Sequence, residues 1–134
     1  MEAIKETREE RKARIKEAEE TQYELDMEQI NDLELTHGDS NIAVVRVPYT
    51  EGLPVCIAVR TPKPNEIKRW RAMYKGKSTE ADTQALEDLA RVCCVYPDKN
   101  TLLQVLEARP AMLINMADAA VSLSTSSRAL EGKG

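Results

Sequence analysis

The spacing of hydrophobic and polar positions changes along the chain, and each change predicts a different element. From residue 2 to about 24, charged side chains three and four apart favour a helix, with a weak apolar stripe at Ile15, Ala18, Gln22 and Leu25. From Leu33 and Leu35 onward the period becomes two, and β-branched residues are frequent as far as residue 61. Residues 32–61 are therefore predicted to form two or three antiparallel strands. Because a lone hairpin is marginal in water, helices are expected to cover one face of this β-meander.

Helical spacing returns in the second half of the chain. Four stretches predict helices, bounded by Pro, Gly and capping residues, over 61–77, 78–96, 99–109 and 110–130. The predicted fold class is therefore α+β, with a charged N-terminal helix, a small antiparallel β-meander and a C-terminal bundle of about four helices. The predicted organisation is an arm over residues 1–30 and a single α+β domain over residues 31–134.

The N-terminal helix has little apolar surface, although most helical stability in proteins comes from packing an apolar face. Two interpretations stay open for it. It is either a solvated helix, or an arm that another chain completes. In the second case the residues that contact the partner would be Ile15, Ala18 and Leu25.

Composition and charge narrow the class of protein. The 134 residues suit one domain, and a net charge of −4 gives no overall attraction to nucleic acid or to an anionic membrane. No segment is long and apolar enough to cross a bilayer, and the charged N-terminus lacks the apolar centre of a secretory signal. Three cysteines, two of them adjacent, are most simply explained by a reducing cytoplasm.

The adjacent Cys93 and Cys94 are interpreted as core residues. Cys93 continues the helical stripe of Leu86 and Leu89, and free cysteine packs as a small hydrophobe. Zinc sites use C-x₂₋₄-C pairs or histidines at set spacing, whereas the sequence holds one histidine, His37, far away in a turn-rich stretch. No catalytic residue, metal ligand or cofactor is predicted, and the protein is not expected to be an enzyme.

The strongest positive patch runs from residue 68 to 77 and includes five bases, two aromatics and no acid. Lys68, Arg71 and Lys75 form one row of a helix and are candidate contacts to an acidic protein surface or to phosphates, although a solvated row is the simpler explanation. Nucleic acid is not the expected partner of so acidic a chain. Met73 could supply adaptable apolar surface for a client, and Met112 and Met116 are interpreted as core.

One block of the chain resembles a known class of proteins. It includes a strand ending in Arg-Thr-Pro, a helix beginning near Glu66-Ile-Lys-Arg-Trp, and a helix ending in Val-Tyr-Pro-Asp, followed by a short helix that ends in Arg-Pro and then a last helix. Over about residues 55–123 this order resembles the tail assembly chaperones, small proteins encoded in the structural operons of tailed bacteriophages.

The resemblance implies a non-enzymatic protein of the host cytoplasm. Such chaperones bind and solubilise the long, helical tape-measure protein until tail tube subunits polymerise around it, and they are absent from the finished particle. A phage structural protein would then be the partner, and a homo-oligomer is possible. Two alternatives stay open: a permanent virion component of the head or tail with an extended N-terminal arm, and a small phage-encoded inhibitor of a host system.

Overall fold

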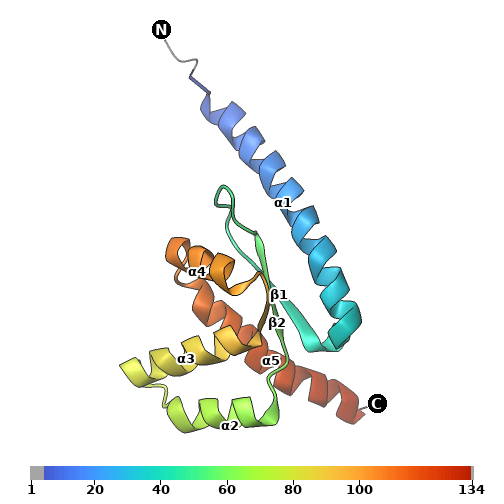
Figure 1. Cartoon of the computed structure of the whole chain (residues 1–134), viewed down its shortest axis with the longest axis vertical. Helices are drawn as coiled ribbons and strands as arrows, with labels where there is room; N and C mark the ends of the chain where they lie inside the picture. The colour runs from blue at the N-terminus through green and yellow to red at the C-terminus, as the bar shows by residue number, and fades with distance from the viewer. Residues whose placement is uncertain (1–4, 134) are drawn as a thin grey trace.

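The chain folds into a three-stranded antiparallel sheet with helices on both faces (Figure 1). The computed structural model describes residues 5–133, with side chains described as far as residue 125. Its elements are, in chain order, α1 (Arg8–His37), η1 (Asp39–Asn41), β1 (Ile42–Arg46), β2 (Cys56–Arg60), α2 (Pro64–Met73), α3 (Glu80–Cys93), β3 (Cys94–Tyr96), α4 (Lys99–Ala108) and α5 (Met112–Lys133). The predicted α+β class, with a long N-terminal helix and helices after the first strands, is confirmed.

Strand β2 lies in the middle of the sheet, between β1 and β3. Its pairing with β1 is antiparallel and places Val44 opposite Ala58. Its pairing with β3 is also antiparallel, with a register shift between Ala58 and Val59. The β-branched residues of β1 and β2 suit a pleated surface, so the strands predicted within residues 32–61 are confirmed for these two segments.

Alternate side chains of β2 point to two different cores, as the pleat of a strand requires. Ile57 and Val59 belong to the larger core, which the helices α3, α4 and α5 complete with Leu89, Ala90, Cys93, Leu102, Val105, Met112, Met116 and Ala120. Cys56 and Ala58 point the other way and pack with Ile30 of α1. Helices therefore cover both faces of the sheet, and the interpretation of Met112 and Met116 as core residues is confirmed.

Helix α1 is longer at its C-terminal end than its charge pattern predicts. It begins at Arg8 after the cap Thr7, so the predicted start at residue 2 lies outside the described residues, and it ends at His37 instead of near residue 24. The strand predicted around Leu33 and Leu35 is therefore wrong. Spacings of three and four from Ile30 continue the inward face of the helix, and Gly38, with φ of +92°, ends it.

The buried carboxylate of Asp26 fastens α1 to the sheet. Asp26 Oδ2 accepts hydrogen bonds from the backbone N–H groups of Val55 (2.7 Å) and Cys56 (3.1 Å). Asp26 Oδ1 accepts from Gln22 Nε2 (2.9 Å) and from the hydroxyl of Tyr96 on β3. The predicted boundary between residues 30 and 31 falls inside α1, whose second half contributes to one of the two cores.

Strand β3 occupies a segment that was predicted to be helical. The helix α3 ends at Cys93, and the backbone turns extended at Cys94, with φ of −69° and ψ of 121°. Cys94 and Tyr96 then pair with Val59 and Ala58 of β2. The prediction of a helix through Tyr96 is wrong because pairing with the free edge of β2, distant in sequence, overrides the local helical pattern.

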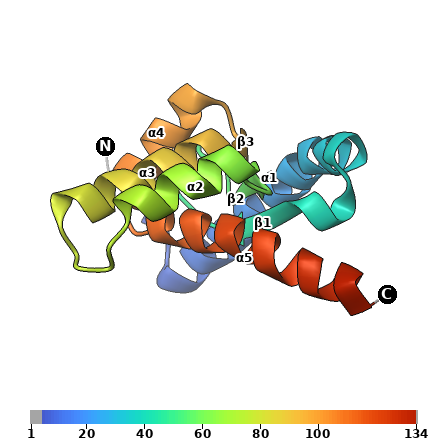
Figure 2. The ribbon, with the colours of Figure 1, turned by 90° about the horizontal axis from the view of Figure 1, so that it is seen from below.

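The remaining helices form where the sequence pattern predicts them, although α2, at Pro64–Met73, is shorter at both ends than the predicted 61–77. Thr79 caps α3 and Asp98 caps α4, each through a side-chain oxygen that accepts a backbone N–H. Figure 2 shows α2 beside α3 and α5 running beneath the sheet. Across the described residues, none of the helices has both the length and the apolar character that a membrane span requires.

The adjacent cysteines give a first test of the packing. Cys93 is fully buried in the larger core, whereas Cys94 is half-buried on β3. We expect Cys93→Ser to lower the free energy of unfolding by about 2 kcal/mol, because a hydroxyl would be buried without a partner. Cys94→Ser should cost less than about 1 kcal/mol, since its Sγ already lies 3.4 Å from the Tyr96 carbonyl oxygen, which a hydroxyl could also use. Equal losses of unfolding free energy for the two variants, measured by urea unfolding, would contradict the placement of Cys93, but not Cys94, on the core face.

Candidate functional site

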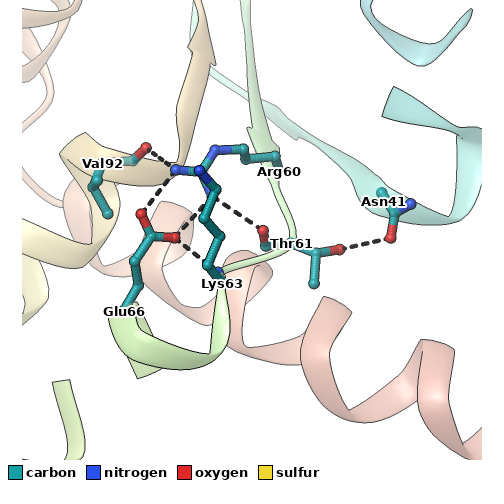
Figure 3. Close-up of polar contacts among 6 residues, drawn as sticks. All are labelled: Asn41, Arg60, Thr61, Lys63, Glu66 and Val92. Atoms are coloured by element: carbon teal, nitrogen blue, oxygen red, sulfur yellow. Dashed lines mark hydrogen bonds and ion pairs between the residues drawn. The ribbon is translucent and has the colours of Figure 1, made fainter. Parts of the chain in front are cut away.

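The guanidinium of Arg60 joins three elements at one end of the sheet (Figure 3). Arg60 stands at the end of β2 and makes a bidentate ion pair with Glu66 of α2, with N–O distances of 2.8 and 2.9 Å. The same guanidinium donates to the carbonyl oxygen of Val92 on α3 at 2.9 Å. The pair is mostly buried, and these hydrogen bonds lower the pKa of Glu66 and raise that of Arg60. The Arg60 contact therefore sets the position of α2 against the C-terminal end of α3.

A second carboxylate holds the other end of α2 against α3. The buried Asp82 accepts hydrogen bonds from the backbone N–H groups of Lys75 (2.6 Å) and Lys77 (2.5 Å), which lie in the loop between the two helices. The Lys75 N–H is the largest cause of a lowered pKa for Asp82, ahead of the opposing effect of burial. The α2–α3 hairpin is thus fixed at both ends by charge-assisted hydrogen bonds.

Two adjoining hollows run along the outer face of this hairpin, and together we call them the α3 groove. The larger, about 560 Å³, lies between α3 and α4 and is lined by Arg69, Asp88, Arg91, Val92, Cys94, Pro97, Lys99, Leu102 and Leu103. The smaller, about 80 Å³, lies between α2 and α3 and is lined by Glu66, Arg69, Trp70, Met73, Ala85, Asp88, Leu89 and Val92. The two share Arg69, Asp88 and Val92, so they lie side by side along α3.

The larger hollow combines apolar surface with positive charge. Val92 and Leu103 are large aliphatic side chains that remain 45% and 47% exposed there. Three bases line the same hollow, Arg69, Arg91 and Lys99, against one acid, and Arg91 also forms an ion pair with Glu87 of the same helix. A net positive apolar groove favours a partner segment that presents aliphatic and acidic side chains together.

The smaller hollow adds an aromatic and a thioether. The Trp70 ring stacks on Tyr74 with centroids 5.1 Å apart, and Met73 lies one position before that tyrosine. The indole N–H of Trp70 is buried and has no hydrogen-bond acceptor among the described residues. A buried donor without an acceptor is costly, and this N–H has almost no exposed surface through which a bound partner could reach it.

The structure separates the predicted contact residues of α2. Met73 lines the α3 groove, together with Arg69, which the sequence pattern did not single out. Lys68 and Arg71 are exposed on α2, whereas Lys75 lies past the end of the helix in the loop to α3, so the predicted row of three bases on one helix is wrong; these three are not among the residues that line the groove. The α2 helix therefore has one face toward the groove and separate bases in solvent.

The predicted contact residues of α1 lie elsewhere. Ile15 and Ala18 are half-buried, and Ala18 borders a hollow between α1 and the loop that joins β1 to β2. Leu25 is 54% exposed on the side of α1 that faces away from the sheet. The weak stripe proposed from the sequence thus does not form the packed face of α1, which runs instead through Tyr23, Asp26, Met27 and Ile30.

Burial leaves the three thiols poorly suited to act as nucleophiles. Burial raises the pKa of Cys56 to about 11, of Cys93 to about 12 and of Cys94 to about 11, so these thiols are protonated and weakly nucleophilic at neutral pH. Within residues 5–125 no group of three or more His, Cys, Asp or Glu side chains is arranged to hold a metal ion. Asp26 and Tyr96 are close together, but the carboxylate is fully buried and its contacts are internal.

Sequence reasoning missed Asp26, Arg60, Glu66 and the groove itself. Only one of these left a local signal: Glu66 stands three residues after Lys63 at the start of a helix, where it accepts the Lys63 N–H at 2.8 Å. Asp26 depends on contacts 29 to 70 positions away, and Arg60 pairs with Glu66 six positions on and with Val92 32 positions on. Comparisons with models of protein families, with curated proteins and with solved structures find no match to this chain.

Proposed function

We propose that the protein is a non-enzymatic binding protein whose α3 groove holds an amphipathic helical segment of a partner. The observation that carries this proposal is the groove itself, in which exposed Val92 and Leu103 are bordered by three bases. A helix that presents aliphatic side chains at positions i, i+3, i+4 and i+7, with acids beside them, fits such a surface. The partner would bury the aliphatic side chains that α3 and α4 leave exposed.

The resemblance to the tail assembly chaperones gives this partner a candidate identity. A tape-measure protein is long and helical, and it needs its apolar surface covered until the tail tube forms around it. A groove with Met73 and a stacked Trp70 at one end is adaptable, because a thioether side chain packs against varied shapes. In this proposal the protein is a phage tail assembly chaperone that acts in the host cytoplasm.

A permanent virion component is the second candidate, and the shape of α1 favours it. In Figure 1 the first turns of α1 extend past the loop that joins β1 to β2. These turns are charged and mostly exposed from Arg8 to Arg14. A projecting helix of this kind could reach a neighbouring subunit in an assembled particle.

A binding experiment with matched variants tests the groove. Fluorescein-labelled peptides that tile the tape-measure protein of the same phage would be titrated with the full chain, read by anisotropy. We expect acidic amphipathic peptides to bind, and Leu103→Ser to weaken the dissociation constant by about tenfold. Ile114→Ser removes an aliphatic side chain of similar exposure, 52%, outside the groove and should leave binding unchanged. Equal effects of the two substitutions, or no bound peptide, would contradict the proposal.

The two candidate functions differ in the finished particle. Tagged protein would be purified from infected cells, and the phage particles would be analysed separately by quantitative mass spectrometry. Recovery of the tape-measure protein with the tag, and particles without the tagged chain, supports the chaperone. Particles that contain the chain at fixed stoichiometry would exclude the chaperone and support the virion component.

A further inference from the structure

The second half of α1 has a strongly one-sided charge. From residue 17 to 34 the sequence includes eight acidic residues and neither Lys nor Arg, whereas the first half of the helix mixes both signs. One of these acids, Asp26, is buried, and most of the others are exposed. This part of α1 therefore presents an acidic surface to solvent.

Two large aliphatic side chains lie in that acidic surface. Leu25 and Leu35 are 54% and 77% exposed, and Glu28 and Asp32 lie between them at spacings of three and four residues. These four residues, which we call the α1 outer stripe, share one face of the helix, opposite the face that packs on the sheet. At 1.5 Å per residue the stripe is about 15 Å long, which is shorter than the roughly 21 Å of α3.

The α1 outer stripe complements the α3 groove. The stripe presents leucines and acids, and the groove presents Val92, Leu103 and the bases Arg69 and Lys99, beside Arg91, which is paired with Glu87. The stripe cannot reach the groove of its own chain, because the other face of α1 is fastened to one side of the sheet while α3 and α4 pack on the other side (Figures 1 and 2). A second copy of the chain has no such constraint.

We infer that the protein self-associates, with the α1 outer stripe of one copy bound in the α3 groove of another. This inference concerns the groove of the proposed function, but it requires no client. Each copy has one stripe and one groove, so the contact either closes reciprocally in a dimer or continues from copy to copy. A client helix would then compete with the α1 outer stripe, and the groove would stay covered until a client arrives.

Charge reversal on each surface tests the inference. The two variants are Glu28→Lys with Asp32→Lys on the stripe, and Arg69→Glu with Lys99→Glu in the groove. All four residues are exposed, and an acid at position 99 suits the first turn of α4. In sedimentation velocity of the full chain we expect wild type to form dimers or larger species. Each variant alone should have a self-dissociation constant at least about tenfold weaker.

Mixing the two variants gives the decisive result. The native stripe of one fits the native groove of the other, and the two reversed surfaces also attract each other, so an equimolar mixture should associate again. Lys68→Glu with Lys75→Glu, which reverses one exposed base of α2 and one of the loop that follows it, both outside the groove, should leave association unchanged. Association should also weaken between about 50 and 500 mM salt.

Three outcomes would overturn the inference: a wild-type monomer at all concentrations, association that persists in both variants, or a mixture that stays monomeric. None of them bears on the peptide titration, so failure of self-association leaves the proposed function standing. Conversely, self-association without peptide binding would contradict the proposed function and leave the inference of self-association standing.

Discussion

Replacing Asp26 with alanine is expected to lower the free energy of unfolding by about 4 kcal/mol. The carboxylate is fully buried and accepts hydrogen bonds from two backbone N–H groups, from Gln22 Nε2 and from the Tyr96 hydroxyl. Its removal would leave the buried N–H donors of Val55 and Cys56, and the part-buried hydroxyl of Tyr96, without this acceptor. Each orphaned buried donor costs about 1–3 kcal/mol, so the total is large for one side chain.

Graded substitutions separate this effect from general damage to α1. Asp26→Asn keeps the shape and one acceptor oxygen but points an NH₂ group at donors, so we expect a loss of about 2–3 kcal/mol. Tyr96→Phe removes one of the donors and should cost about 1 kcal/mol. Asp32→Ala removes an exposed acid from the same helix and should change stability by less than about 0.5 kcal/mol. Urea unfolding monitored by circular dichroism measures all four, and similar losses for Asp26→Ala and Asp32→Ala would contradict the assignment.

The local signals in the sequence predicted the local parts of the fold. Helix caps at Thr79 and Asp98 depend on residues three positions away, and alternation in β1 and β2 depends on nearest neighbours. The assignment of Cys93, Met112 and Met116 to the core likewise followed from helical spacing. These features are confirmed because each needs only a short stretch of chain to specify it.

The features that the sequence did not predict depend on partners far along the chain. Leu35 suggested a strand because it alternates with Leu33, but α1 continues through both, with its inward face packed on a sheet that forms later in the chain. An aspartate such as Asp26 in a charged helix gives no sign that distant N–H groups will surround it. β3 is a strand because it can pair with an open edge of β2. The sequence of residues 94–96 alone does not show that this edge is there.

The candidate site likewise combines a feature that local sequence predicted with features that depend on contacts between different elements. Met73 was predicted as apolar surface, and it does line the α3 groove. The groove has its shape because Arg60 binds Glu66 and Val92, which come from two other elements. A groove between helices therefore depends on a buried ion pair that helical spacing does not reveal.

The second large effect is expected for Arg60→Met. Methionine keeps much of the apolar stem of arginine but removes every donor, which leaves Glu66 with only the Lys63 N–H as a partner and frees the Val92 carbonyl. Breaking a mostly buried ion pair from one side is costly, so we expect a loss of about 3 kcal/mol at pH 7. Glu66→Gln, which stays neutral and can still accept from Arg60, should cost about 1.5 kcal/mol.

The pH dependence of this loss identifies the ion pair as its cause. The hydrogen bond from Arg60 is the largest reason that the pKa of Glu66 is below its usual value of 4.5. A depressed carboxyl pKa contributes stability that is complete above the unfolded pKa and is lost as the pH falls through the folded pKa. The difference between wild type and Arg60→Met should therefore be full at pH 7 and should shrink once the pH falls below 4.5. Urea unfolding of both proteins across that range measures it, and a difference independent of pH would mean that Arg60 acts through packing instead of through Glu66.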